Sequence, residues 1–115
     1  MDARGTETEL TPERAAQAAG DERWQVVDVR EPREHEAGHI AGARLVPLGE
    51  LSAQAATLDR GRPVLVYCRV GARSGLAAQA LRSAGFEAYN LAGGLAAWDS
   101  AGLPLDPDDG HVAEH

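Results

Sequence analysis

A chain of 115 residues with 43% hydrophobic and 25% charged residues has the size and composition of one folded domain and is too short for two. Its formal net charge of -7 disfavours binding to nucleic acid or to anionic membranes, and no apolar run approaches the ~20 residues that span a bilayer. The first ten residues lack the apolar core of a secretory signal. The single cysteine, Cys68, cannot form an internal disulfide, so we expect a cytoplasmic protein.

The chain alternates helical segments with short apolar runs rich in β-branched residues. The first helix is predicted with Thr11 as its N-cap, Pro12 in its first turn and Gly20 after its end. In chain order, the predicted elements are a helix over 10–20, a strand over 24–30, a short helix within 31–40, a strand over 43–48, a helix over 48–59, a strand over 64–67, a helix over 73–85, a strand within 86–94 and a short helix within 94–105. Strands separated by helices imply a mainly parallel sheet with helices on both faces.

Two further features of these elements can be checked in a structure. In the helix over 73–85, Leu76, Ala80 and Leu81 are expected to share one face. The final segment over 106–115, DPDDGHVAEH, is acidic and has no apolar periodicity, so it is predicted to be disordered.

The sole cysteine follows an apolar strand directly and precedes a helix that starts near Ser74. Ligand sites in parallel sheets lie beyond the carboxyl ends of the strands. A thiol there faces unpaired helix amides, and Arg69 and Arg73 add positive charge, so the thiolate of Cys68 is favoured. Gly71 lets successive amides converge into an anion-binding nest. The alternative, an inert buried cysteine, does not explain two arginines and a glycine within five residues.

The spacing within this loop separates two kinds of cysteine chemistry. Phosphatases wrap a phosphate in a Cys-x5-Arg loop, but here the second arginine, Arg73, gives Cys-x4-Arg and the next position is Ser74. A loop that is one residue shorter has less room for a phosphate ester. It suits a smaller group, such as one sulfur atom carried on the cysteine.

Three stretches of the chain are informative together: CRVGARS (residues 68–74), VVDVREPREHEAGHIAGARLVPL (residues 26–48) and LAGGLAAWDSAGLPL (residues 91–105). They resemble motifs of the single-domain rhodanese (thiosulfate sulfurtransferase) family. The first contains a loop, beginning at Cys68, that resembles the six-residue active loop of the family. The second is similar to its upstream signature and the third to its downstream signature. The resemblance implies an α/β, rhodanese-like domain over 8–105 with a mainly parallel sheet of about five strands and helices on both faces.

The resemblance also implies an activity and a site. Cys68 is expected to take a sulfane sulfur from a donor such as thiosulfate and to pass it, through a persulfide, to cyanide, a thiol or a protein thiol. No metal or organic cofactor is implied. The residues expected to bind the substrate are those of the loop after the cysteine, namely Arg69, Val70, Gly71, Ala72, Arg73 and Ser74.

For two other groups the structural interpretation is preferred. Asp28 and Arg30 are expected to form an ion pair that fixes loops at the carboxyl edge of the sheet. His35 and His39 have the i,i+4 spacing of a metal pair on a helix, but Gly38 ends that helix between them and no third ligand is near in sequence.

Two other functions remain open on the sequence. Rhodanese-like domains also serve as non-catalytic binding or regulatory modules or as partners of sulfur carriers, although the retained Cys68 favours an enzyme. Phosphatase or arsenate-reductase chemistry is the third interpretation. It is disfavoured by the loop length and, for reductases, by the lack of a second, resolving thiol.

Overall fold

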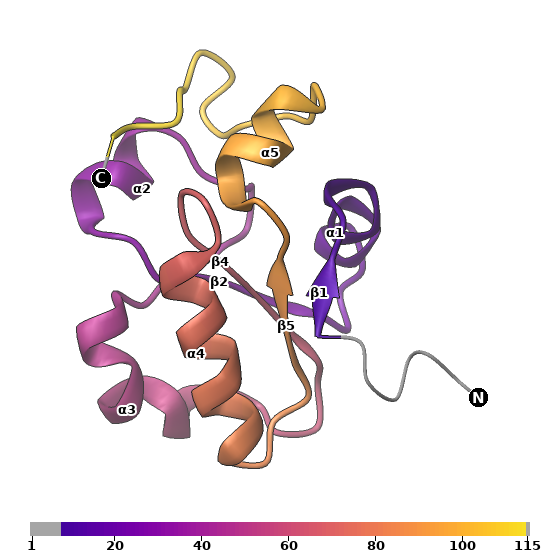
Figure 1. The fold of residues 1–115 in the computed structure, drawn as a ribbon, viewed down its shortest axis with the longest axis vertical. Helices are drawn as coiled ribbons and strands as arrows, with labels where there is room; N and C mark the ends of the chain where they lie inside the picture. Colours follow the sequence, from indigo (N-terminus) through magenta and orange to yellow (C-terminus); the bar gives the residue numbers. More distant parts are fainter. Residues whose placement is uncertain (1–7, 115) are drawn as a thin grey trace.

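The computed structural model describes residues 8–114, in which five parallel strands form one sheet in the order β1-β5-β4-β2-β3 (Figure 1). The strands are β1 (Glu9–Leu10), β2 (Gln25–Asp28), β3 (Arg44–Leu45), β4 (Val64–Tyr67) and β5 (Ala88–Leu91). The helices are α1 (Pro12–Ala19), α2 (Pro32–Ala37), α3 (Leu51–Gln54), α4 (Ala72–Ser83) and α5 (Gly94–Ser100), with 3-10 turns η2 (Leu48–Glu50) and η3 (Ala55–Thr57). This architecture confirms the predicted α/β fold.

Helices cover both faces of the sheet and divide the core in two (Figure 1). The central strand β4 is buried throughout because its side chains alternate between the two halves. Val64 and Val66 pack with α3 and α4, whereas Leu65 and Tyr67 pack with α1 and α5. No helix within residues 8–114 has the length and apolar character needed to cross a membrane.

The start of the described chain holds one element that the sequence did not reveal. Residues Glu9–Leu10 form the short edge strand β1, which pairs with β5, where a helix was expected to include Leu10. The predicted helix then begins at Pro12, and the Thr11 hydroxyl accepts a hydrogen bond from the Arg14 amide, so the predicted N-cap is confirmed.

The prediction that Leu76, Ala80 and Leu81 share one face of α4 is wrong. The Leu76 side chain is 64% exposed and Ala80 is also exposed, whereas Ala77 and Ala78 are buried with Leu81. The alanines of α4 lie on several sides of the helix, so the apolar pattern does not identify one buried face. The buried face is the one that allows the closest approach to the sheet. The expected helix over 48–59 is likewise divided into η2, α3 and η3.

Residues 106–114, for which the sequence predicts disorder, lie along α2 in the structure (Figure 1). His39 and Asp106 exchange two backbone hydrogen bonds of 3.1 and 2.8 Å, and the His111 amide donates to the Ala37 carbonyl at 2.9 Å. A Cβ on Gly38 would lie 2.5 Å from the His111 oxygen, so this contact requires a glycine. Backbone hydrogen bonds and a close approach need no apolar periodicity, so the sequence pattern does not reveal these contacts.

Candidate active site

The candidate site lies at the carboxyl edge of the sheet, between the end of β4 and the start of α4. Cys68 follows β4 directly, and residues 68–74, here called the active loop, lead into α4. β4 lies between β2 and β5, so the residues that end these neighbouring strands flank the cysteine. Only 1% of the surface of Cys68 is exposed.

Three hydrogen-bond donors point at the Cys68 sulfur. The Gly71 amide lies 3.1 Å from Sγ, the Ser74 amide 3.4 Å and the Ser74 hydroxyl 3.3 Å. Burial of the sulfur disfavours the thiolate, but donation from the Ser74 hydroxyl and from the Ser74, Gly71 and Val70 amides outweighs it, so the pKa of the Cys68 thiol is lowered. Gly71 has a φ of 104°, a left-handed conformation that only glycine adopts readily.

The start of α5 holds the outer side of the active loop. The Leu95 amide donates to the Cys68 carbonyl at 2.8 Å, and the Ala96 amide donates to the Arg69 carbonyl at 2.9 Å. These bonds fix the first carbonyls of the loop, so that its later amides can face the sulfur. The approach is close, because a Cβ on Gly94 would lie 2.5 Å from the carbonyl carbon and oxygen of Arg69. Gly94, the first residue of α5, is therefore part of the site.

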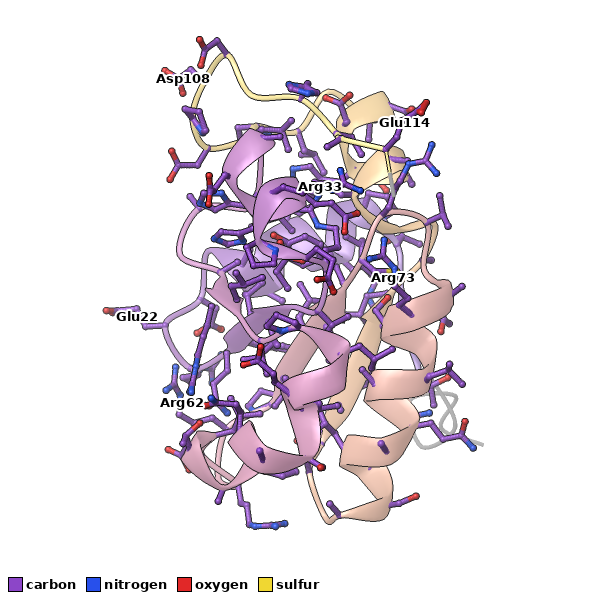
Figure 2. All side chains as sticks on the ribbon, turned by 90° about the vertical axis from the view of Figure 1, so that its left-hand side faces the viewer. Glu22, Arg33, Arg62, Arg73, Asp108 and Glu114 are labelled. Carbon is purple, nitrogen blue, oxygen red and sulfur yellow. The ribbon has the colours of Figure 1, made fainter. Side chains whose placement is uncertain are left out.

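The two arginines of the active loop have different surroundings. Arg73 makes two hydrogen bonds, of 2.9 and 3.0 Å, to the carboxylate of the buried Glu34 on α2, and Figure 2 shows it at the upper end of α4. Burial disfavours the charge of Glu34, but Arg73 outweighs it and lowers the pKa of that carboxyl. Arg69 is half-buried, and no ion pair within residues 8–114 involves it. Arg73 is thus engaged by Glu34, whose role the sequence did not reveal.

Asp28 and Arg30 form the ion pair expected from the sequence. Both are fully buried, and the guanidinium reaches the carboxylate through two hydrogen bonds of 2.9 and 2.7 Å. Arg30 also donates to the Gly38 carbonyl at 2.8 Å, and His35 Nδ1 lies 2.9 Å from the Asp28 carboxylate. The pair therefore connects the end of β2 to α2 and to the turn that follows α2.

His35 and His39 lie together but not in a metal-binding arrangement. Their rings stack with centroids 3.9 Å apart and an angle of 11° between the planes. Nδ1 of His39 lies 2.8 Å from the His35 carbonyl oxygen. In the part of the chain that the structure describes, no group of three or more histidine, cysteine, aspartate or glutamate side chains could hold a metal ion.

Sequence reasoning missed Asn90 of β5, which is 4% exposed. Its amide oxygen accepts a hydrogen bond from the Ser74 hydroxyl, and its amide nitrogen donates to the Gly71 carbonyl at 3.1 Å. An asparagine within an otherwise apolar strand was the available signal, because a buried amide needs partners. The sequence could not show that those partners lie in the active loop.

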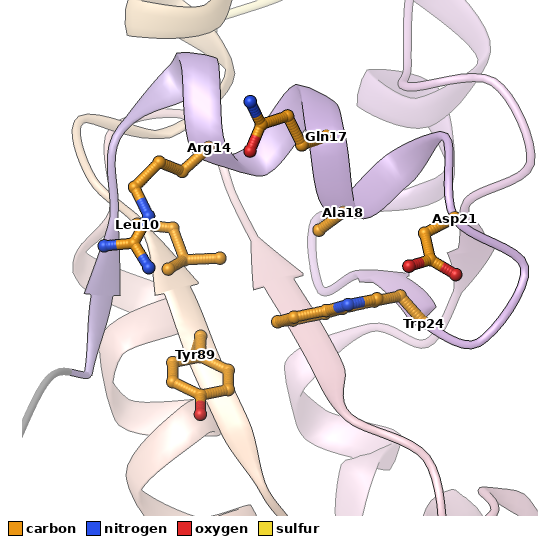
Figure 3. Close-up of a pocket in the computed structure, with 7 residues that line it drawn as sticks. All are labelled: Leu10, Arg14, Gln17, Ala18, Asp21, Trp24 and Tyr89. Atoms are coloured by element: carbon orange, nitrogen blue, oxygen red, sulfur yellow. The ribbon is translucent and has the colours of Figure 1, made fainter. Parts of the chain in front are cut away.

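A separate hollow of about 260 Å³ lies between α1 and the sheet (Figure 3). Its walls come from β1, α1, β5 and the segment before β2 rather than from the active loop. Trp24, which the sequence did not place, packs there with Tyr89 at 5.4 Å between ring centroids. The lining residues are Leu10, Arg14, Gln17, Ala18, Asp21, Trp24 and Tyr89.

Comparisons with known proteins agree with this geometry. Uncharacterized protein YqhL of Bacillus subtilis is 48% identical over 81 residues, which are 70% of this chain, and the chain spans only 64% of the length of YqhL. A protein of Allochromatium vinosum named Sulfurtransferase is 36% identical over 86 residues, covering 74% of this chain and 80% of that protein. The crystal structure of a rhodanese-related protein from Thermoplasma volcanium superposes with a TM-score of 0.80 at 28% identity, over 85% of this chain and 96% of the other.

A family model described as the rhodanese-like domain matches residues 11–101, which include the active loop and all the helices of the structure. Together with the five-stranded parallel sheet and a buried cysteine at its carboxyl edge, this match shows that the chain belongs to the rhodanese-like domain family.

Proposed function

We propose that this protein is a sulfurtransferase that carries sulfur as a persulfide on Cys68. The observation that supports the proposal best is the set of donors from Gly71 and Ser74 aimed at the sulfur. Such donors favour the thiolate, the form of cysteine that attacks sulfur. A free thiol is essential to this chemistry, which suits a reducing compartment such as the cytoplasm.

The first half of the reaction loads the cysteine. The Cys68 thiolate attacks the outer sulfur of a donor such as thiosulfate and forms a new S–S bond. The bond between the outer sulfur and the sulfonate sulfur breaks, its electron pair goes to the sulfonate, and sulfite leaves. The outer sulfur keeps the negative charge that it carried in the donor, and in the persulfide the active-loop amides stabilise that charge.

The second half transfers the sulfur. The thiolate of an acceptor attacks the outer sulfur, the S–S bond to Cys68 breaks, and the electron pair returns to Sγ. Hydrogen bonds from Gly71 and Ser74 then stabilise the thiolate. Cyanide would react in the same way. Val70 and Leu76 are the exposed large apolar side chains within residues 8–114, at 53% and 64%. Val70 lies in the active loop and Leu76 lies in α4 just after it. They offer a protein acceptor an apolar contact, so we favour a thiol on a protein.

Mass spectrometry of the intact protein tests the proposal. After incubation with thiosulfate or with inorganic polysulfide and removal of the excess, the unchanged protein should gain one sulfur atom, and Cys68→Ser should gain none. If only polysulfide loads the protein, thiosulfate is not the donor, but the proposed persulfide on Cys68 stands.

The absence of loading by either donor, with a reduced cysteine and an intact fold, would overturn the proposal. It would favour the other function consistent with the family, a non-catalytic module that binds a partner. Hydrolysis of an aryl phosphate would instead point to phosphatase chemistry, which the short loop disfavours.

A further inference from the structure

The Ser74 hydroxyl lies between two acceptors. Its oxygen is 3.3 Å from the Cys68 sulfur, and it also lies within hydrogen-bond distance of the amide oxygen of Asn90. All three residues are buried. A hydroxyl carries one hydrogen, so it can donate to only one of these acceptors at a time.

The orientation of the Asn90 amide follows from its other partners. The nitrogen Nδ2 faces the Gly71 carbonyl at 3.1 Å and the two carboxylate oxygens of Glu9 at 3.2 and 3.1 Å. All three are acceptors, so the end of the side chain that faces them must be the NH₂ group. The amide oxygen is therefore the end that faces Ser74, and Glu9 of the edge strand β1 holds it there.

We propose that Asn90 is a positioning residue for the reaction of Cys68, because its amide oxygen competes with the cysteine sulfur for the single hydrogen of the Ser74 hydroxyl. When the sulfur is a thiolate, its full charge attracts the hydrogen. When the sulfur is neutral, the amide oxygen is the stronger acceptor and the hydrogen turns towards Asn90. The hydroxyl thus follows the charge on the sulfur without any movement of the backbone.

This competition has a use in sulfur transfer, and in that respect the inference rests on the proposed function. In the persulfide the negative charge lies on the outer sulfur, and the inner sulfur no longer needs the Ser74 hydrogen. Asn90 accepts it, so the hydroxyl keeps a partner in a buried site. When the acceptor removes the outer sulfur, charge returns to the inner sulfur, and the hydroxyl turns back to stabilise the leaving thiolate.

The charged groups near Cys68 must be kept constant in a test. Arg73 and its partner Glu34 lie on the α2 side of the cysteine, and Arg69 lies in the active loop. The Asp28–Arg30 pair lies at the end of the neighbouring strand β2. On the β5 side the nearest charge in the network is Glu9, which reaches the site through Asn90. Substitution of Asn90 by an uncharged residue of similar shape leaves these charges unchanged, and Leu meets that requirement.

The test is the pH dependence of Cys68 alkylation by iodoacetamide in four proteins: unchanged, Asn90→Leu, Ser74→Ala and the double variant. We expect Ser74→Ala to move the apparent pKa upwards, because the thiolate loses a donor. Asn90→Leu should move it downwards by about 0.5 to 1 unit, because the competing acceptor is gone. In the Ser74→Ala background, Asn90→Leu should move it by less than about 0.2 unit.

A purely structural role for Asn90 gives different results. If Asn90 only anchors Gly71, its loss loosens the active loop and raises the apparent pKa with or without Ser74, and this result would overturn the proposal. Equal shifts in both backgrounds would also overturn it.

If Asn90→Leu fails to fold, Glu9→Gln takes its place, because Glu9 lies at the surface and polarises the amide of Asn90. Its downward shift should be at least twofold larger with Ser74 present than with Ser74→Ala, and equal shifts would overturn the proposal. Alkylation requires no sulfur donor. The result therefore stands apart from the thiosulfate-loading experiment, and a failure of sulfur transfer is distinguishable from a failure of this inference.

Discussion

Neutral donors surround the Cys68 sulfur, whereas two pairs of opposite charges lie beside it. The sulfur receives hydrogen bonds from backbone amides and a hydroxyl. Next to it, Asp28 pairs with Arg30, and Glu34 pairs with Arg73, in largely buried surroundings. The comparison separates two tasks. Fixed dipoles stabilise a charge that appears and disappears during a reaction, whereas permanent charges, which burial makes costly, are used in pairs to hold the frame.

The largest expected effect comes from breaking the fully buried ion pair of Asp28 and Arg30. Asp28→Asn leaves Arg30 charged and uncompensated in the core, so the free energy of unfolding should fall by about 3–5 kcal/mol. Urea denaturation measures the change. Asp21→Asn is the matched control, because it breaks the exposed pair with Arg23 and should leave stability unchanged. Equal losses in the two variants would show that burial is not what gives the Asp28 pair its importance.

The second prediction concerns the active loop, whose neutral donors face the sulfur. Gly94→Ala places a Cβ against the backbone of Arg69, which cannot turn away as a side chain can, so we expect a loss of about 2–3 kcal/mol in stability and slower alkylation of Cys68. Gly102→Ala is the control, because Gly102 also has a positive φ but a Cβ there meets nothing within 4 Å. Its alkylation rate should equal that of the unchanged protein. Parallel behaviour of both variants would exclude a specific effect on the active loop.

The third prediction concerns the pair that joins α2 to α4. Glu34→Gln should lower stability at neutral pH by about 1–2 kcal/mol, since Arg73 is only partly shielded from water. It should also lower the apparent pKa of Cys68, because a negative charge nearby is removed. Glu36→Gln, an exposed position on the same helix, serves as the control and should change neither quantity.

The same pair predicts a pH dependence. The pKa of Glu34 is lower in the folded chain than its ordinary value of 4.5, so the stability that it contributes is fully present above that value and is lost as the pH falls through the lowered folded value. The difference in unfolding free energy between the unchanged protein and Glu34→Gln should therefore shrink on acidification. A difference that stays constant below pH 4 would contradict this assignment.

The smallest expected effect concerns Arg69, which forms no ion pair with the residues that the structure describes. In the proposed reaction with thiosulfate, Arg69→Gln should raise the KM about twofold to fourfold, because a positive charge in the active loop attracts an anionic donor, and added salt should reduce the difference. Arg44→Gln on β3 removes the same charge away from the site and should leave KM unchanged. An effect of equal size in both variants would attribute it to net charge rather than to the active loop.

Local sequence was sufficient for the strand, loop and helix around Cys68, because the apolar run of β4 and the turn residue Gly71 are contiguous in the chain. It was not sufficient for partners that are distant in sequence. Glu34 and Arg73 are 39 residues apart, and their pairing depends on where α2 lies over the active loop. The predicted face of α4 was wrong for a related reason, since an alanine-rich helix takes its buried side from the sheet. Asn90 was visible as a polar residue in an apolar strand, but its partners were not.

The hydrogen bonds from Leu95 and Ala96 to the first carbonyls of the active loop have a consequence during protein synthesis. Cys68 leaves the ribosome well before these two residues, and it also precedes Asn90. Until the last third of the domain has been made, the active loop lacks the hydrogen bonds from Leu95 and Ala96 on its outer side and those of Asn90 on its inner side. During this time the thiol titrates as an ordinary cysteine. The nascent chain therefore carries a cysteine of ordinary reactivity, and the surroundings that favour its thiolate are complete only when the domain is nearly finished.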